Sequence, residues 1–354
     1  MTEKKFMAGN EAIAEAAVLA GCRYYFGYPI TPQNEIGEYM SWRLPEVGGT
    51  FLQAESEVAA IYMVFGAAGA GARVMTSSSS PGISLMQEGI SYIAAAEIPC
   101  VIVNMMRGGP GLGGIHPSQS DYFQATKGGG HGDYHLLVLA PSTGQEAVAL
   151  TMLAFDLADK YRNPVMILGD GNIGQMMESI EFKPQEKTVT LPRKDWAITA
   201  ESGRKRNLIK TLYLDPVILE KRNLAIHQKL CEAVKNEVRF ESFMTEDAQI
   251  VIAAYGTVAR IAKTAIKVLR EKGLKVGLLR PISLYPFPYQ AFAQMAERVK
   301  DFLVVEMSMG QMIEDVKLGM CGKSRIHFYN RVGGMVPSYE EIISEVEKIT
   351  KEAR

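Results

Sequence analysis

The stretch PCVIVNMM, residues 99–106, is apolar along nearly its whole length and lacks the polar alternation of a half-exposed strand. Such a run is typical of a strand buried on both faces, as in a parallel sheet covered by helices. Similar runs predict further strands of the same sheet. These strands are expected at 22–26, 49–53, 72–76, 135–140 and 163–169. The first half of the chain is therefore predicted to be an α/β domain with helices on both faces of a parallel sheet.

Segments with helical signatures alternate with these strands. Asn10 is placed to cap a helix over 11–20 and Gly21 to end it, because Asn suits an N-cap and Gly suits the position after a helix. An alanine-rich helix is expected over 56–70, and another over 81–96 with a proline near its start.

The amino-acid composition of the chain changes near residue 183. Residues 183–240 are polar, proline-bearing and basic, which predicts a linker followed by a helix near 216–238. Alternating strands and helices then resume. The sequence thus predicts an α/β domain over 1–182, a linker with a helix over 183–240, and a smaller α/β domain over 241–354.

The composition argues against several classes of protein. The 354 residues carry a net charge of −1, which is unlike a nucleic-acid binder. No apolar run reaches the ~18 residues that span a bilayer, and the start MTEKK is unlike a signal peptide, so we expect a cytoplasmic protein without a membrane partner. The four cysteines lie far apart, so buried reduced thiols are expected rather than an iron–sulfur cluster or zinc. They are Cys22, Cys100, Cys231 and Cys321.

Polar side chains follow several of the predicted strands. In open parallel sheets, ligands bind beyond the carboxyl ends of the strands. Thr31 in YPITP (28–32) follows the first strand, and Glu55 and Glu57 follow the second. The serine-rich turn TSSSSPG (76–82) follows the third strand, and Arg107 follows the strand at 99–106. These groups are expected to meet at one edge of the sheet.

YPITP places one threonine between two prolines. Thr31 suits an N-cap and Pro32 the first helical turn, while Pro29 stiffens the approach. The prediction is a rigid loop that offers a hydroxyl beside free N–H groups, which suits a small anion such as a carboxylate. A plain capped helix is the alternative interpretation.

The carboxylates and the arginine also allow two interpretations each. Glu57 opens a helix among small and apolar residues, where it either complements the helix dipole or shares a proton with a ring nitrogen in a dry pocket. Glu55 competes for the second role, and spacing alone does not choose between them. Arg107 either binds a carboxylate through two hydrogen bonds or forms a surface ion pair.

Longer stretches resemble the alpha subunit of 2-oxoacid:ferredoxin oxidoreductases, and the similarity covers nearly the whole chain. The segments are YPITP, QAESEVAAIYMVFGAAGAGARVMTSSSSPGISLMQE (53–88), PCVIVNMMRGGPGLG (99–113), LRPISLYPFP (279–288), VVEMSMGQMIEDVK (304–317) and NRVGG (330–334). LYLDP (212–216) and KNEVRF (235–240) favour the 2-oxoisovalerate, or branched-chain, type.

The resemblance implies oxidative decarboxylation that depends on thiamine diphosphate: a 2-oxoacid and coenzyme A give an acyl-CoA, carbon dioxide and reduced ferredoxin. It implies a pyrimidine-binding domain followed by one like the transketolase C-terminal domain. By matching the motifs, Glu57 is the glutamate at N1′ of the aminopyrimidine, Thr31 and Arg107 contact the substrate, Arg107 also borders the cofactor, and Pro29 and Ile30 approach the cofactor through their backbone.

The resemblance also implies partners. GDGNIG (169–174) begins like a thiamine motif, but no NN pair follows in the expected window, so we interpret it as a turn after a strand. The diphosphate and its Mg²⁺ are then expected on a beta subunit, and iron–sulfur clusters on a ferredoxin-like subunit, with further small subunits.

Two other motifs are weak. GGPGLGG (108–114) lacks the spacing of a dinucleotide fingerprint. His131 and His135 have i, i+4 spacing but follow three glycines, so neither a helix nor a metal site is expected there, and His131 at the active-site entrance stays open. Rival functions are the same reaction on 2-oxoglutarate or another 2-oxoacid, a nicotinamide dehydrogenase, and a noncatalytic scaffold subunit.

Overall fold

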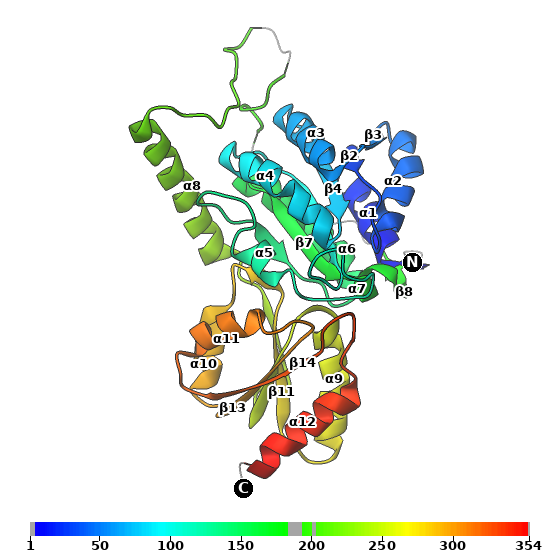
Figure 1. The fold of residues 1–354 in the computed structure, drawn as a ribbon, viewed down its shortest axis with the longest axis vertical. Coiled ribbons are helices and arrows are strands. Elements are labelled where there is room, and N and C mark those ends of the chain that lie inside the picture. Colours follow the sequence, from blue (N-terminus) through cyan, green and yellow to red (C-terminus); the bar gives the residue numbers. More distant parts are fainter. Residues whose placement is uncertain (1–3, 183–192, 200–202, 353–354) are drawn as a thin grey trace.

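The computed structural model describes residues 4–182, 193–199 and 203–352. Two sheets, each with helices against it, lie one above the other along the long axis of the molecule (Figure 1). The N-terminal half builds the larger sheet and the C-terminal part builds the smaller one. This confirms the predicted α/β fold with a second, smaller α/β unit. The boundaries at 182 and 240 remain predictions, and residues 183–192 and 200–202 of the predicted linker lie outside the described residues.

The larger sheet has seven strands in the order β12-β6-β7-β5-β4-β2-β3. All neighbours pair in parallel except β12, which runs antiparallel to β6 and comes from much later in the chain. The strands are β2 (Tyr24–Gly27), β3 (Thr50–Gln53), β4 (Val74–Ser78), β5 (Val101–Met106), β6 (Leu137–Leu139), β7 (Val165–Asp170) and β12 (Ser283–Tyr285).

Helices cover both faces of this sheet because its central strands are apolar on both sides. Val101 and Val103 of β5 face one core, and Ile102 faces the other. The first core is shared with α1, α2 and α6, and the second with α3 and α4. The helices are α1 (Gly9–Leu19), α2 (Asn34–Glu46), α3 (Glu57–Gly69), α4 (Ser80–Ala95), α5 (Tyr122–Thr126), α6 (Gly144–Tyr161) and α7 (Gly171–Gln175).

The smaller sheet has the order β14-β13-β10-β11-β9, with only β9 antiparallel. One of its faces shares the core of α3 and α4, so apolar packing is continuous between the two sheets. Its elements are β9 (Phe240–Phe243), β10 (Ile250–Ala253), α9 (Gly256–Glu271), β11 (Val276–Pro281), α10 (Tyr289–Ala296), β13 (Asp301–Glu306), α11 (Met312–Met320), β14 (Arg325–Asn330) and α12 (Tyr339–Glu352). A separate antiparallel pair joins β1 (Lys4–Ala8) to β8 (Met177–Glu181).

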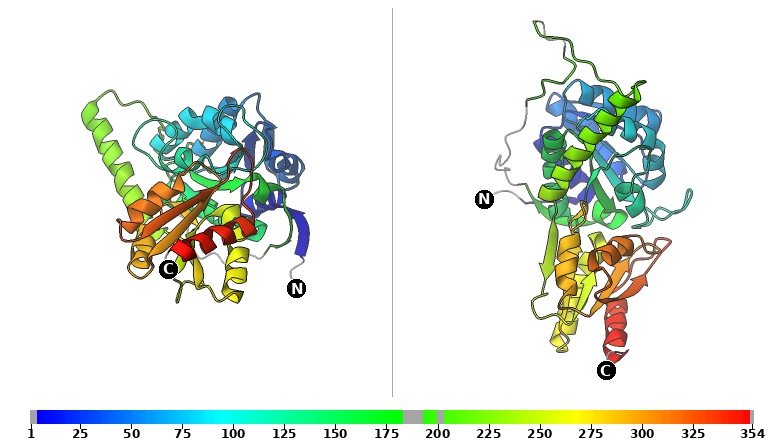
Figure 2. Two further views of the ribbon diagram at one scale, coloured as in Figure 1. Left: turned by 60° about the horizontal axis from the view of Figure 1, so that its bottom comes forward. Right: turned by 90° about the vertical axis from the view of Figure 1, so that its left-hand side faces the viewer.

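Helix α8 (Pro216–Asn236) lies along the flank of the N-terminal part, and residues 203–214 before it reach beyond the neighbouring helices (Figure 2). Its buried side chains, Ile226, Leu230 and Ala233, lie in the second half of the helix. The segment before it and its N-terminal half expose a series of apolar side chains. These are Leu208, Leu212, Leu214, Val217, Ile218, Leu219 and Leu224.

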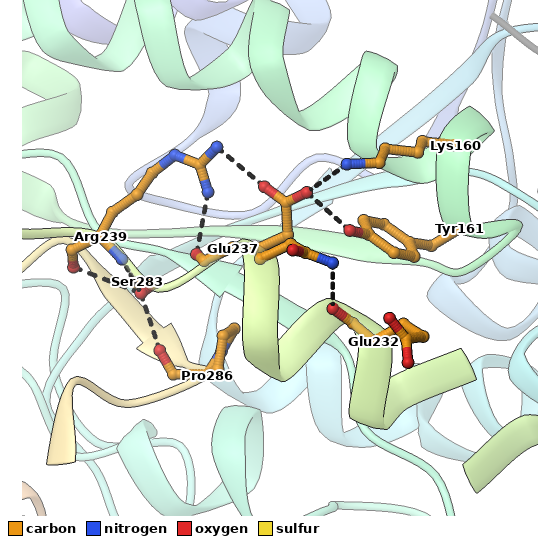
Figure 3. Close-up of polar contacts among 8 residues, drawn as sticks. Lys160, Tyr161, Glu232, Glu237, Arg239, Ser283 and Pro286 are labelled. Carbon is orange, nitrogen blue, oxygen red and sulfur yellow. Dashed lines mark hydrogen bonds and ion pairs between the residues drawn. The ribbon is translucent and has the colours of Figure 1, made fainter. Parts of the chain in front are cut away.

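A polar cluster fixes the end of α8 (Figure 3). The Glu237 carboxylate accepts hydrogen bonds from Lys160 Nζ and Tyr161 O–H, both at 2.7 Å, and from Arg239 Nη2 at 2.9 Å. The N–H of Arg239 donates to Ser283 Oγ at 2.8 Å. The cluster therefore joins α6, the end of α8 and β12.

Two helix-boundary predictions have different outcomes. Gly21 does end α1, with a φ of 88°. The prediction that Asn10 caps α1 is wrong, because the helix already begins at Gly9. Asn10 instead donates from Nδ2 to Pro32 O at 2.8 Å and to Glu35 Oε2 at 2.7 Å. In the described part of the chain, no helix is both long enough and apolar enough to cross a membrane.

Candidate active site

The loop YPITP follows β2 at the carboxyl edge of the larger sheet, but it does not cap α2 as predicted. The helix begins at Asn34 with Gln33 as the N-cap residue, so Thr31 lies two residues too early and Pro32 lies outside the first turn. Asn34 Nδ2 donates to Thr31 Oγ1 at 3.4 Å, and the Thr31–Pro32 peptide is cis. The loop is thus closed by side chains rather than by a threonine cap.

Arg107 joins this loop to the end of β5. Its Nη1 donates to the main-chain carbonyl of Thr31 at 3.0 Å, and its Nη2 donates to that of Leu112 at 3.1 Å. The residue is 7% exposed, and its Nε has no hydrogen-bond partner. The structure therefore brings Thr31 and Arg107 together, and no carboxylate of the described residues pairs with the buried guanidinium.

A network that the sequence did not reveal supports the other side of Arg107. Asp121 Oδ2 accepts from Ser80 Oγ at 2.6 Å and from Asn104 Nδ2 at 3.0 Å. Ser80 Oγ in turn accepts from the N–H of Arg107 at 3.1 Å. Burial raises the pKa of Asp121, although these two hydrogen bonds oppose the effect. No spacing signal links Asp121 to Ser80, because they are 41 residues apart.

Glu57 is the first residue of α3, and the hydroxyl of the preceding Ser56 caps the helix by accepting from the N–H of Ala59 at 3.2 Å. Glu57 is 5% exposed, whereas Glu55 is exposed. Within the described residues the Glu57 carboxylate receives no hydrogen bond from another side chain or from the backbone. Burial therefore distinguishes the two glutamates where spacing did not.

A glycine of α4 packs against the Glu57 carboxylate. An added Cβ at Gly82 would lie 2.5 Å from Glu57 Oε1 and 2.0 Å from Ser78 Oγ, so both atoms lie against this glycine. The hydroxyls of Ser78 and Ser79 are buried, and neither has a hydrogen-bond partner within the part of the chain that the structure describes. Buried polar groups are normally paired, so the unpaired Ser78 hydroxyl beside a buried carboxylate leaves polar atoms that a ligand can satisfy.

Two hollows lie at the loops that follow β2 and β5. Pro29 and Tyr28 line one of about 270 Å³ between the YPITP loop, α2 and β3. Ile30 is half-buried in the same loop. A larger hollow of about 470 Å³ lies between the start of α4, the loop after Arg107 and the Met307–Met309 segment of the smaller α/β unit. The second hollow thus opens between the two units.

The motif GDGNIG is not a plain turn. Asp170 ends β7 and caps α7, where its Oδ1 accepts from the N–H of Asn172 at 3.0 Å and from Thr257 Oγ1 at 2.8 Å. Burial raises the pKa of Asp170. Asp170 therefore joins the two α/β units.

The two candidate histidines do not form a pair. No helix spans 131–135, as expected. His135 contacts Thr126 O through Nδ1 at 3.0 Å and stacks on Tyr285, and burial lowers its pKa. His131 lies edge-on to Tyr92. Among residues 4–182, 193–199 and 203–352, no group of three or more His, Cys, Asp or Glu side chains is arranged to hold a metal ion.

Two family models together match most of the chain. Residues 15–245 match the thiamine-diphosphate-binding domain of pyruvate flavodoxin/ferredoxin oxidoreductases, and residues 248–342 match core domain II of pyruvate:ferredoxin oxidoreductases. The chain belongs to the pyruvate flavodoxin/ferredoxin oxidoreductase family. It is thus a subunit of a 2-oxoacid:ferredoxin oxidoreductase, as the resemblance implied.

Named relatives of this family extend over the whole chain. Ketoisovalerate oxidoreductase subunit VorB of Methanothermobacter marburgensis is 49% identical, with 99% of each chain covered. 2-Oxoglutarate synthase subunit KorA of Methanothermobacter thermautotrophicus is 36% identical, with 99% of this chain and 100% of the relative covered. The solved 2-oxoglutarate:ferredoxin oxidoreductase of Magnetococcus marinus superposes with a TM-score of 0.88 at 28% identity. That match covers 98% of this chain and 65% of the longer one.

The polar groups around Gly82 suit the aminopyrimidine of thiamine diphosphate, the cofactor of the matched domain. A ring nitrogen and an exocyclic amine need one carboxylate and further polar partners at the wall of a closed site. Among the described residues, the Glu57 carboxylate and the Ser78 hydroxyl have no hydrogen-bond partner, and both lie against Gly82, where an added Cβ would collide with them.

Proposed function

We propose that this chain is the alpha subunit of an enzyme that oxidatively decarboxylates 3-methyl-2-oxobutanoate. The products are the branched acyl-CoA, carbon dioxide and reduced ferredoxin. The observation that carries the proposal is the buried Glu57 carboxylate, which has no hydrogen-bond partner among the described residues and lies against Gly82 beside the unpaired Ser78 hydroxyl.

The proposed role of Glu57 is to hold a proton at N1′ of the aminopyrimidine. Bound thiamine diphosphate supplies a carbon nucleophile that attacks the keto carbon of the substrate. A carboxylate at the start of α3 is favoured by the helix dipole, and its burial keeps water from competing for the hydrogen bond. Glu57 therefore has the charge and the shielded position that this contact requires.

Arg107 and Thr31 are the proposed substrate contacts. Two guanidinium N–H groups of Arg107 are used by the carbonyls of Thr31 and Leu112, and its buried Nε is unpaired. An arginine held in this way can offer its remaining donors to the carboxylate of a 2-oxoacid. The Thr31 hydroxyl lies on the same loop, and the backbone of Pro29 and Ile30 is proposed to border the cofactor.

The other half of the cofactor site is proposed to lie on a beta subunit that binds the diphosphate and Mg²⁺. Iron–sulfur clusters are assigned to a ferredoxin-like partner, alongside small subunits. Exposed apolar side chains on the helices that carry Glu57 and Gly82 favour a covering partner. They are Val58 and Tyr62 on α3 and Leu85 on α4. The exposed leucines before and along α8 offer a second apolar surface of this kind.

A cytoplasmic location and the boundaries 1–182, 183–240 and 241–354 are part of the proposal. All four cysteines are free thiols in the structure, which suits a reducing compartment. Burial raises the pKa of Cys22 and Cys100 to about 12, so these two thiols stay protonated and inert.

The alternative substrate is 2-oxoglutarate, which the names of the KorA relatives and of the Magnetococcus marinus enzyme favour. The higher identity to VorB favours the branched-chain substrate instead. A test is to purify the holoenzyme through a tag on this chain and assay 2-oxoacids with coenzyme A and ferredoxin. The proposal expects the highest kcat/KM with 3-methyl-2-oxobutanoate. A preference for 2-oxoglutarate overturns the substrate, and the absence of activity with every 2-oxoacid in the fully assembled complex overturns the function.

A further inference from the structure

The loop that carries Arg107 is closed on itself. Arg107 forms an isolated antiparallel bridge with Pro117. The N–H of Gly108 donates to His116 O at 3.0 Å, and Arg107 Nη2 reaches Leu112 O at 3.1 Å. The position of the guanidinium therefore depends on the returning arm of the loop as well as on β5.

Gln119 lies two residues after Pro117 and packs against the smaller α/β unit. Its side chain is fully buried. Gln119 Nε2 donates to Tyr255 O at 2.9 Å, and its Oε1 accepts from the N–H of Met307 at 3.0 Å. Its own N–H donates to Met307 O at 2.9 Å, and its carbonyl accepts from the Tyr255 hydroxyl at 3.3 Å. Every polar group of Gln119 is bonded, and every partner belongs to the smaller unit.

The smaller unit also touches the loop from a second direction. Gly334, in the NRVGG segment, has a φ of 92°, and an added Cβ there would lie 2.5 Å from His116 Cβ. An added Cβ at Gly108 would lie 3.4 Å from Gly334 N. The glycine therefore allows the NRVGG backbone to lie directly against the base of the Arg107 loop. Gln119 and Gly334 together hold the returning arm from two sides.

We infer that Gln119 is a positioning residue, through which the smaller α/β unit fixes the Arg107 guanidinium at the substrate site. The inference rests on the proposed function, in which Arg107 binds the carboxylate of the 2-oxoacid. Releasing the amide leaves the buried N–H of Met307 without its partner and removes one of the two hydrogen bonds to the carbonyl of Tyr255, which also accepts from the N–H of Ala259 at 3.2 Å. The loop therefore has a strong preference for its docked position. Because the loop has a single docked position, the Arg107 guanidinium is held in a single position at the substrate site.

The test uses the holoenzyme with Gln119→Met, which keeps the length of the side chain but removes both amide contacts. The KM for the 2-oxoacid is expected to rise about tenfold with kcat changed less than about threefold, because a displaced arginine weakens substrate binding without altering Glu57. An unchanged KM in a correctly assembled enzyme overturns the inference.

Tyr122→Phe is the matched control at the same interface. It removes a buried hydrogen bond of 2.6 Å from Tyr122 O–H to Asp315 Oδ2, but Asp315 keeps Lys127 and Tyr289 as donors. Its KM is expected to stay within about twofold of the parent enzyme, because the contact does not touch the loop from 107 to 117. A tenfold rise in this control would show a general effect of loosening the interface, and would count against a specific role of Gln119.

A double-mutant cycle separates the inference from the proposed function. Arg107→Ala is expected to raise the KM, and Gln119→Met added to it is expected to raise the KM no further. If Arg107→Ala leaves the KM unchanged, the proposed role of Arg107 fails. If Arg107→Ala raises the KM and Gln119→Met raises it independently, only the inference about Gln119 fails.

Gly334→Ala provides a second route if Gln119→Met does not assemble. The new Cβ presses on His116 from the NRVGG side and moves the same loop without touching the buried amide. The same pattern is expected, namely a KM raised about tenfold and a kcat changed less than about threefold. A Gly334→Ala holoenzyme with an unaltered KM overturns the inference.

Discussion

Arg107 Nη1 donates a 3.0 Å hydrogen bond to the main-chain carbonyl of Thr31, although the two residues are 76 positions apart in the chain. The contact joins the loop after β2 to the end of β5, across the intervening strand β4. It also orients the arginine through the backbone of Thr31, so that the threonine hydroxyl is not consumed by it. Side-chain changes at the two residues can therefore be separated in experiment.

Arg107→Lys is predicted to raise the KM for the 2-oxoacid by about 10- to 100-fold, because a lysine cannot replace a bidentate guanidinium. Thr31→Val keeps the carbonyl that accepts from Arg107 and removes only the hydroxyl. It is predicted to lower kcat/KM by about 3- to 30-fold. Steady-state kinetics of the two holoenzymes measure both effects. Parent-like kinetics in Arg107→Lys would contradict its assignment to the substrate.

Gly82→Ala is predicted to abolish most activity while the chain remains folded. The new methyl group would collide with Ser78 Oγ and Glu57 Oε1, so the carboxylate must leave its present position. We expect kcat to fall at least about 100-fold. Gly66→Ala in α3 is the control, because no heavy atom lies within 4 Å of its added Cβ. Near-parent turnover in Gly82→Ala would show that activity does not depend on the present position of the Glu57 carboxylate.

Glu237→Gln is predicted to lower the free energy of unfolding by about 1–3 kcal/mol at pH 7. Burial alone would raise the pKa of Glu237, but the hydrogen bonds from Lys160, Tyr161 and Arg239 outweigh it and lower the pKa below its usual range (Figure 3). A lowered folded-state pKa gives stability that is present above the unfolded pKa of about 4.3 and is lost as the pH falls through the folded value.

The difference between the parent and Glu237→Gln should therefore shrink as the pH falls from about 5 toward 2. Urea unfolding at several pH values measures it. Glu232→Gln serves as the control, because the Glu232 side chain is 55% exposed and pairs only with Lys235 of the same helix. Its effect is expected to stay below about 0.5 kcal/mol. A difference between the parent and Glu237→Gln that is constant down to pH 2 would contradict the account of this cluster.

The fold was predictable where burial leaves a strong compositional signal. The run at 99–106 is apolar because neighbouring side chains of β5 face two different cores, and the same reason applies to the other central strands. The three-residue strand β12 has no such signal, since its sequence gives no sign that it will pair antiparallel with β6. Strand β9 is short and half-exposed, and it was missed for the same reason.

Local capping chemistry was less predictable than the elements themselves. Asn10 and Thr31 have the residue types of N-caps, yet each helix begins one or more residues away from the position that a cap there would require. Asn10 bonds to Pro32 O instead, which brings a residue of α1 to the loop after β2. A tertiary contact of this kind overrides local preference, and the sequence of either segment alone does not reveal it.

The candidate site was also only partly predictable from the sequence. Glu57, Thr31 and Arg107 follow strands and could be placed at one edge of the sheet from their positions. Burial then distinguishes Glu57 from Glu55, which spacing alone could not do. Asp121 and Gln119 could not be found from spacing, because their partners lie in distant segments of the chain.

The central claim is that Glu57 holds the aminopyrimidine of a cofactor whose diphosphate a partner subunit binds. Its most direct test is the turnover of a Glu57→Gln holoenzyme, with Glu55→Gln as the exposed control. We predict that kcat falls at least about 100-fold in Glu57→Gln while subunit assembly is unchanged, and that Glu55→Gln keeps near-parent turnover. Near-parent turnover in an intact Glu57→Gln complex would contradict the claim.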